Sequence, residues 1–305
     1  MSDEDFKLGF DDTAAGPNEA QFDLQGMLLT IAATGALIAP MAWGGPSGIV
    51  ISVAMLIAGF AYGRSGWLGL VGAILIFVVL TFIALGARGA TMSARRSHSA
   101  NNIRQMAIAI HDYHDKHRAL PPRFSVDENG KPLHSWRVLI LPFLGEQELY
   151  DQIDLTKPWS APENLKFHNQ MPEVFSCPNL PKKMGHTVTP YVAIGGANTA
   201  WPDGGGLNLN QISKSDGTSQ TIALIEASIV ATNWMAPFDI HLGQLDLLFQ
   251  NCDNELSNFE GRYTGCNVVM CDASTLFFSR VDQLEMLRAM ATRNGGEDIS
   301  ELNPF

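Results

Sequence analysis

Residues 67–85 read WLGLVGAILIFVVLTFIAL, a run without a charged side chain. A helix needs roughly 17–25 consecutive apolar residues to cross the hydrocarbon core of a bilayer. A helix in a soluble core normally keeps a polar face, and this run has none. It therefore predicts a transmembrane helix over residues 67–86, and it separates a membrane part of the chain from a globular part.

Two more apolar stretches lie upstream of this run, in a region that is also free of charged side chains. They cover residues 27–43 and 48–63, and the turn-forming sequence GGPS joins them. We predict a transmembrane hairpin here, because backbone groups inside a bilayer must be satisfied within helices. Together with the third segment, residues 27–86 would cross the lipid bilayer three times.

The charge of the chain argues against a nucleic-acid partner. The net charge is -11 and the isoelectric point is about 5.1, whereas binding to phosphates needs clustered lysine and arginine. Residues 1–26 are acidic, with Lys7 as their basic residue, so they lack the basic start of a secretory signal peptide. We predict that they form a disordered tail.

The globular part, residues 90–305, begins with a helical pattern and continues with strands. From residue 90 to 117 an apolar stripe at helical spacing is formed by Ile103, Met106, Ile110 and Tyr113, and Pro121 and Pro122 end it. Short apolar runs predict strands at 188–194, 221–225, 266–270 and 275–278, and a closing helix at 281–292. This order predicts an α+β fold in which a long helix packs on an antiparallel β-sheet.

Short ordered motifs run through this globular part. They include Arg95-Arg96-Ser97, His111-Asp112-Tyr113-His114, Ser135-Trp136-Arg137-Val138, Phe175-Ser176-Cys177-Pro178, Ser215-Asp216-Gly217-Thr218-Ser219, and Trp234 with Pro237 and Asp239. On these motifs, residues 94–300 resemble the planctomycete pseudopilin-like proteins called domain of unknown function 1559. The resemblance implies a globular domain with a pilin-like fold that lies outside the cytoplasmic membrane. It implies no known activity.

The sequence departs from that family near both ends. The family closes with His, nine residues and Asp-Gly, where this chain has Arg262 and Asp272-Ala273, so chemistry that depends on the histidine is lost. If Asp272-Ala273 turns a hairpin, alanine at a positive φ costs roughly 1 kcal/mol or forces another turn type. Family members also begin with a prepilin-like leader and one hydrophobic helix, whereas Asp11-Asp12 follow Gly9-Phe10 here. Assembly into a pilus-like fibre is therefore not expected.

Two arguments about membrane orientation disagree. The basic residues after the third segment outnumber those before it, with Arg88, Arg95, Arg96 and Arg104 against Lys7 and Arg64. The positive-inside rule then favours a cytoplasmic globular domain. The family resemblance implies the opposite side, and we expect a multi-pass protein of the cytoplasmic membrane whose globular domain is extracytoplasmic.

Histidines and cysteines supply weak candidates for metal or redox chemistry. His111 and His114 share a helix face, so they are metal candidates, with packing and hydrogen bonding as the alternative. Cys266 and Cys271 would face opposite sides of one strand. A disulfide between Cys252 and Cys266 is an alternative to free buried thiols. No cofactor is expected.

Arg137 and Glu226 are the candidate charged pair. Both lie in apolar, strand-like sequence, where an unpaired charge is costly, so we expect each to have a partner and predict that they pair with each other. The pair would be structural or, alternatively, would bind a ligand. The sequence Asp216-Gly217-Thr218-Ser219 predicts a turn rather than a nucleophilic site, and no catalytic residue is assigned.

Two functions follow as hypotheses. The first is a non-enzymatic envelope protein that binds a protein or glycan through exposed aromatic residues, with Trp159, Trp201 and Trp234 as contact candidates. It predicts no concave polar site around Arg137 or Glu226. The second is a membrane-tethered sensor or carrier of a small solute or metal ion, which predicts that a ligand stabilises the domain.

Overall fold

The computed structural model describes residues 67–180, 186–203, 205–227, 230–245, 265–278 and 283–296. The chain divides into two compact units, Met1–Gly89 and Ala90–Phe305, and the packing described below belongs to the second. The predicted tail and the first two predicted membrane segments lie outside the described residues. Among the residues whose side chains are described, no helix is both long enough and apolar enough to cross a membrane; the side chains of 67–89 are not among them.

The long helix α3, Trp67–His117, carries the predicted apolar stripe. Ile103 and Met106 are fully buried and Ile110 nearly so, while Tyr113 packs against the same core from its edge. The helix ends at Arg118, which has a φ of 61° and donates its backbone N–H to the carbonyl of His114 over 2.6 Å. A residue in this left-handed conformation is a common way to end a helix, and Pro121 and Pro122 follow after two residues.

The central sheet is antiparallel and has the strand order β10-β9-β6-β4. Its strands are β4 (Tyr191–Val192), β6 (Ile222–Glu226), β9 (Cys266–Met270) and β10 (Thr275–Phe278). The bounds of β9 and β10 agree with the prediction, and β6 begins one residue later than predicted. The described residues therefore confirm an α+β domain with an antiparallel sheet.

The predicted strand 188–194 is wrong as a single element. It forms three short strands, β3 (Val188–Thr189), β4 and β5 (Ile194–Gly195), and each pairs in a different sheet. Pro190 separates the first two and has no N–H to donate to a ladder. The backbone N–H of Ala193 separates the others, because it donates to Oδ1 of Asp239 over 2.9 Å.

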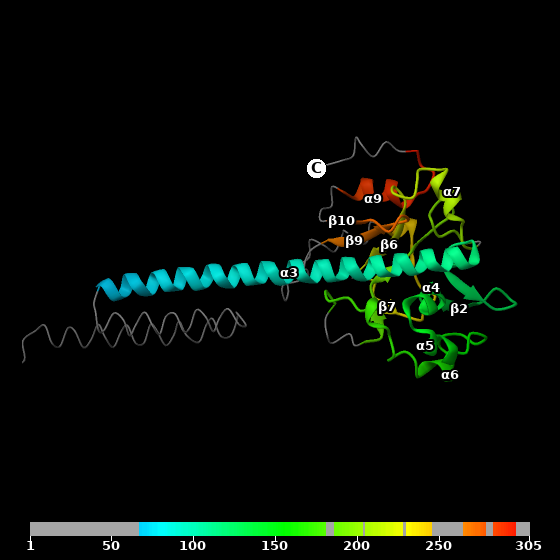
Figure 1. Cartoon of the computed structure of the whole chain (residues 1–305), viewed down its shortest axis with the longest axis horizontal. Helices are drawn as coiled ribbons and strands as arrows, with labels where there is room; N and C mark the ends of the chain where they lie inside the picture. Colours follow the sequence, from blue (N-terminus) through cyan, green and yellow to red (C-terminus); the bar gives the residue numbers. More distant parts are fainter. Residues whose placement is uncertain are drawn as a thin grey trace, which may run out of the picture. The chain divides into compact units, whose positions relative to one another are not determined.

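Apolar clusters cover both faces of the central sheet. On one face, Leu224 and Val269 pack in the same cluster as Ile103 and Met106 of α3. On the other face, Val268 packs with the helix α9 (Leu284–Ala291). Figure 1 shows α3 and α9 on opposite sides of β9. Cys266 packs in the cluster that contains α9, and Cys271 packs in the cluster that contains α3. The alternation of side chains along a strand predicts these opposite sides.

The remaining elements surround this three-layer centre. A hairpin of β1 (Phe124–Val126) and β2 (Pro132–Ser135) leads into α4 (Trp136–Leu139). Short helical segments then follow at η1 (Leu141–Leu144), α5 (Gln147–Gln152), α6 (Pro162–Leu165), η2 (Glu173–Phe175) and α7 (Leu209–Ser213). Two strands complete the small sheets, β7 (Thr232–Asn233) with β3 and β8 (Ile240–His241) with β5, and η5 (Leu242–Gln244) follows β8.

The hairpin between β9 and β10 turns at Asp272-Ala273, as predicted. Ala273 has a φ of 66°, and its N–H donates to the carbonyl of Met270 over 2.9 Å. Oδ1 of Asp272 accepts from both the backbone N–H and the hydroxyl of Ser274, at 2.8 and 2.6 Å. The turn thus keeps the glycine-type backbone conformation although alanine occupies the position.

We expect Ala273→Gly to raise the free energy of unfolding by about 1 kcal/mol, because glycine adopts a positive φ without the Cβ clash. Urea unfolding of the full chain in detergent, followed by tryptophan fluorescence, measures the change. The matched control is Ala94→Gly at an exposed position of α3, which should lower stability by up to about 1 kcal/mol. A loss of stability in both variants would contradict the assignment of strain to Ala273.

Candidate functional site

Arg137 lies in the interior of the globular unit, where hydrogen bonds and an ion pair to other protein groups hold its side chain. Its side chain is 0% exposed. Nε and Nη2 donate to the carbonyl of Tyr191 over 3.0 and 2.6 Å, and Nη1 donates to Oγ of Ser135 over 2.6 Å. Ser135 is also the N-cap of α4, since Oγ accepts from the backbone N–H of Arg137 at 3.3 Å. The cap and the guanidinium therefore hold each other in place.

Asp239 completes this cluster as the ion-pair partner of Arg137. Nη2 of Arg137 lies 3.0 Å from Oδ1 of Asp239, whose side chain is 1% exposed. The same oxygen accepts from Nε1 of Trp136 over 3.1 Å and from the N–H of Ala193. Burial raises the pKa of Asp239, and the guanidinium opposes that rise. Burial likewise lowers the pKa of Arg137. The predicted pairing of Arg137 with Glu226 is therefore wrong.

Glu226 belongs to a second buried cluster, between α3 and the sheet. Its Oε2 accepts from Oγ of Ser99 and from Nδ2 of Asn267, each over 2.7 Å. Its Oε1 accepts from the thiol of Cys177 over 3.2 Å. These donors come from α3, from β9 and from the segment after η2, so one carboxylate joins three parts of the chain.

Tyr191 connects the two clusters. Its carbonyl accepts from Arg137, its hydroxyl lies 2.9 Å from Oγ of Ser99, and its Cα is paired with that of Glu226 in the sheet. Burial raises the pKa of the Tyr191 hydroxyl well above its usual value. Burial and the nearby Glu226 carboxylate likewise raise the pKa of the Cys177 thiol. Both groups stay protonated at neutral pH, so they act as hydrogen-bonding groups and not as nucleophiles.

The sequence did not single out Ser99, Tyr191 or Asn267, and it placed Cys177 and Asp239 only within family motifs. A signal existed for Asp239, because a carboxylate within the largely apolar sequence 234–240 needs a partner if that segment is buried. Nothing in the sequence spacing connects Ser99 or Asn267 to Glu226. They meet because α3 and β9 both pack against β6.

Two of the three predicted contact tryptophans are buried. Trp201 is 2% exposed and Trp234 is 0% exposed. Their indole N–H groups donate to the carbonyls of Ala223 and His168, over 2.6 and 3.2 Å. Tryptophan can be enclosed when its N–H finds such a partner, so the predicted surface role is wrong for both. Trp159 is half-buried and stacks on His168.

His111 and His114 attach α3 to two other segments. Nε2 of His111 lies 2.9 Å from the carbonyl of Cys271, so this nitrogen carries the proton. Nε2 of His114 accepts from the backbone N–H of Leu209 over 3.3 Å, so the proton of this ring is on Nδ1. Each ring thus uses one nitrogen for a backbone contact. Within the described residues no group of three metal-ligating side chains occurs, and Cys252, the predicted disulfide partner of Cys266, lies outside them.

His134 is a buried histidine that the sequence did not single out. It is 0% exposed, and Nε2 donates to the carbonyl of Lys157 over 2.7 Å. Its Nδ1 has no hydrogen-bond partner among the described residues. Burial lowers the pKa of His134 below its usual 6.5, and contacts with Asp154 and Lys157 oppose that shift only in part.

We expect the folded state to be less stable in mild acid because of His134. Because its pKa is lowered in the folded state, the unfolded chain binds the proton more readily, and stability falls as the pH drops from about 6.5 through the lowered pKa. Melting temperatures of the full chain, measured from about pH 7.5 to about pH 4.5, give the slope of stability against pH across the usual histidine pKa. His134→Gln should flatten part of it, whereas His98→Gln, at an exposed position of α3, should not. Equal slopes in both variants would assign the effect to other groups.

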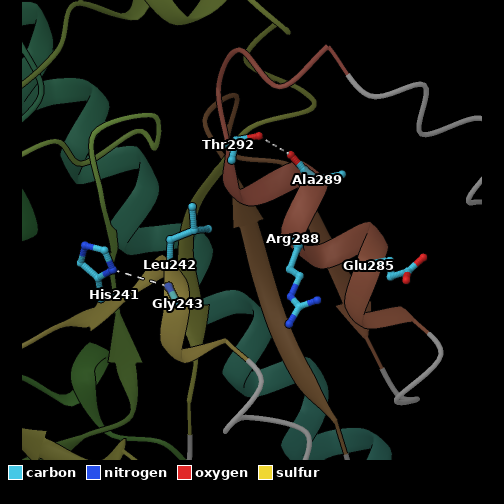
Figure 2. Close-up of a pocket in the computed structure, with 7 residues that line it drawn as sticks. All are labelled: His241, Leu242, Gly243, Glu285, Arg288, Ala289 and Thr292. Carbon is cyan, nitrogen blue, oxygen red and sulfur yellow. Dashed lines mark hydrogen bonds between the residues drawn. The ribbon is translucent and has the colours of Figure 1, made fainter.

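A shallow hollow of about 600 Å³ lies between η5 and α9. His241, Leu242 and Gly243 form one side, and Glu285, Arg288, Ala289 and Thr292 of α9 and its end form the other. Figure 2 shows the Arg288 side chain between α9 and the His241–Gly243 segment, while Glu285 points away from it. Nδ1 of His241 accepts from the N–H of Gly243 at 3.5 Å. The lining of the hollow therefore includes groups of both charges, the Arg288 guanidinium and the Glu285 carboxylate.

The sequence Asp216-Gly217-Thr218-Ser219 forms a turn, as predicted. Gly217 has a φ of 100°, and its carbonyl accepts from the hydroxyl of Thr221 over 2.9 Å. Oδ2 of Asp216 accepts from the backbone N–H of Gly295 over 2.9 Å. Asp216 therefore fixes the segment that follows α9.

Comparison with protein-family models identifies a family that part of the chain matches. Residues 89–215 match the model of the family described as protein of unknown function (DUF1559). The match covers all of the part of α3 that lies in the globular unit, the Arg137 segment, Cys177 and Tyr191, and it ends before β6. No curated protein and no solved structure matches the chain.

Proposed function

We propose, from the DUF1559 match of residues 89–215, that this is a membrane-anchored, non-enzymatic envelope protein of planctomycete and pseudopilin-like type. Its α+β domain would bind a protein or glycan partner, and residues 27–86 would hold it at the cytoplasmic membrane. The domain would lie outside the cytoplasm.

The burial of the charged residues favours a partner bound at the surface over a solute bound at Arg137 or Glu226. Arg137, Asp239 and Glu226 have side-chain or residue exposures of 0, 1 and 2%. Among the described residues, the hydrogen-bond partners of Arg137 include the Tyr191 carbonyl and Ser135, and those of Glu226 include Ser99, Asn267 and Cys177. A solute would have to break these contacts to reach the charges, which costs several kcal/mol. The charges support the fold and leave recognition to the surface.

Topology is the experiment that tests the anchoring and the orientation. A reporter that is active only outside the cytoplasm is fused after Phe305, and a second is placed in the predicted turn at residues 44–47. Activity of both reporters is the expected result, because three crossings put these points on one side. Silence of both would put the domain in the cytoplasm and overturn the envelope assignment.

A further inference from the structure

A hollow of about 300 Å³ lies beside strand β1, and we call it the β1 hollow. Its lining comes from residues 122–126 and from the segment that follows Trp201: Pro122, Arg123, Phe124, Ser125, Val126, Pro202, Asp203 and Gly205. All of these residues belong to the globular unit. Pockets that bind small molecules have volumes of roughly 300–1,000 Å³, so the β1 hollow suits a small ring rather than a long segment of chain.

Both walls of the β1 hollow are fixed by contacts within the protein. The carbonyl of Arg123 accepts from the N–H of Trp136 over 3.0 Å, and Nη2 of Arg123 donates to Oδ1 of Asp203 over 2.6 Å. Just before the first wall, the N–H of Leu120 donates to the carbonyl of Leu207, which follows the second wall. A hollow that already exists before binding loses little conformational entropy when a ligand enters.

Two polar groups of the lining are open to a ligand. The Asp203 side chain is 65% exposed, its Oδ1 is used by Arg123, and no described residue donates to its Oδ2. Oγ of Ser125 accepts from the N–H of His134 over 3.1 Å, so the Ser125 hydroxyl can donate its own proton. The β1 hollow thus offers a ligand one hydrogen-bond acceptor and one hydroxyl donor.

The rest of the lining is largely apolar. Carbon surface comes from Pro122, Phe124, Val126 and Pro202. Val126 is 51% exposed, and the guanidinium of Arg123 lies 5.3 Å from the centre of the Phe124 ring. Because this guanidinium and the Asp203 carboxylate neutralise each other, the β1 hollow offers no net charge to an ionic ligand.

We propose that the β1 hollow binds a neutral sugar ring, as one unit of a glycan. The proposal rests on the function proposed above and selects the glycan from its two partner classes. A sugar ring combines an apolar C–H face, which would pack on Phe124 and Val126, with hydroxyl groups at its edge. One hydroxyl would donate to Oδ2 of Asp203, and another would accept from the hydroxyl of Ser125. An extended peptide would instead need a longer groove.

Ligand-observed NMR with the full chain, in a detergent without a sugar headgroup, tests the site. The neutral probes are maltose, cellobiose and N,N′-diacetylchitobiose, and saturation transfer from the protein to their ring protons is measured. We expect at least one probe to bind with a dissociation constant of about 1 mM. Asp203→Ala, which removes a charged acceptor, should weaken this binding about tenfold, and Phe124→Leu should weaken it several-fold. Glu128→Ala, the matched control at an exposed position of the same hairpin outside the lining, should leave it unchanged.

The outcomes separate the sugar site from the proposed function. Absence of binding with all three probes overturns the sugar site, as does binding that Asp203→Ala and Phe124→Leu both leave unchanged. Equal transfer to digalacturonate would overturn the choice of a neutral ligand. Transfer to a short proline-rich peptide that Asp203→Ala abolishes would assign the hollow to a protein partner and overturn the sugar site. Sugar binding together with silent topology reporters would keep the sugar site and overturn the envelope assignment.

Discussion

Replacing Asp239 with alanine should lower the free energy of unfolding by about 3–5 kcal/mol. Arg137 is 0% exposed and would lose its one ion-pair partner among the described residues, so the guanidinium would stay buried without compensation. The N–H groups of Trp136 and Ala193 would lose their acceptor as well. Urea unfolding of the full chain in detergent, followed by the fluorescence of the buried tryptophans, measures the loss.

Two further variants separate a buried charge from a general loss of contacts. Asp203→Ala removes the partner of Arg123 at the surface, where the Asp203 side chain is 65% exposed, and should cost less than about 1 kcal/mol. The double variant Arg137→Met with Asp239→Leu removes both charges and should recover part of the stability that Asp239→Ala loses. If Asp203→Ala and Asp239→Ala cost the same, burial is not what makes the Arg137 pair important.

The substitution Gly206→Ala should destabilise the fold by about 3 kcal/mol or more. A Cβ on Gly206 would lie 1.6 Å from the carbonyl oxygen of Leu120, and backbone cannot move aside as the end of a side chain does. The neighbouring hydrogen bond from the N–H of Leu120 to the carbonyl of Leu207, at 2.7 Å, holds the two segments together. The same unfolding experiment measures the effect.

Alanine substitutions at two other glycines serve as comparisons for Gly206→Ala. Gly195→Ala would meet Nη1 of Arg123 at 1.4 Å, and because that atom ends a flexible side chain we expect a smaller loss than at Gly206. Gly243 has no atom within 4 Å of the added Cβ, so Gly243→Ala should change stability by about 0.5 kcal/mol at most. A Gly206→Ala variant as stable as Gly243→Ala would show that the two backbones can separate without cost.

Neighbouring residues were enough to predict the long helix, the later strands and one turn. The stripe of Ile103, Met106 and Ile110, the bounds of β9 and β10, and the turn at Gly217 all follow from periodicity or turn chemistry over a few residues. The positive φ of Ala273 also follows from the short connection between those strands, in which Cys271, Asp272 and Ala273 lie between the hydrogen-bonded Met270 and Ser274.

The partners of the buried charges came from packing between distant segments. Asp239 is 102 residues from Arg137, and Ser99 is 127 residues from Glu226. Local sequence can mark a charge that needs a partner but does not say which distant residue that partner is, so the prediction joined Arg137 to Glu226. The same limit applies to Trp201 and Trp234, whose exposure depends on which carbonyl reaches the indole N–H.

Local sequence therefore established the apolar segments, the long helix and the later strands, because backbone conformation and hydrophobic pattern depend on near neighbours. Tertiary packing decided which carboxylate neutralises Arg137, which donors reach Glu226 and which aromatic residues stay at the surface. A buried polar group must find its partner wherever the fold brings one, and that choice is made by the arrangement of α3, β4, β6 and β9 in space.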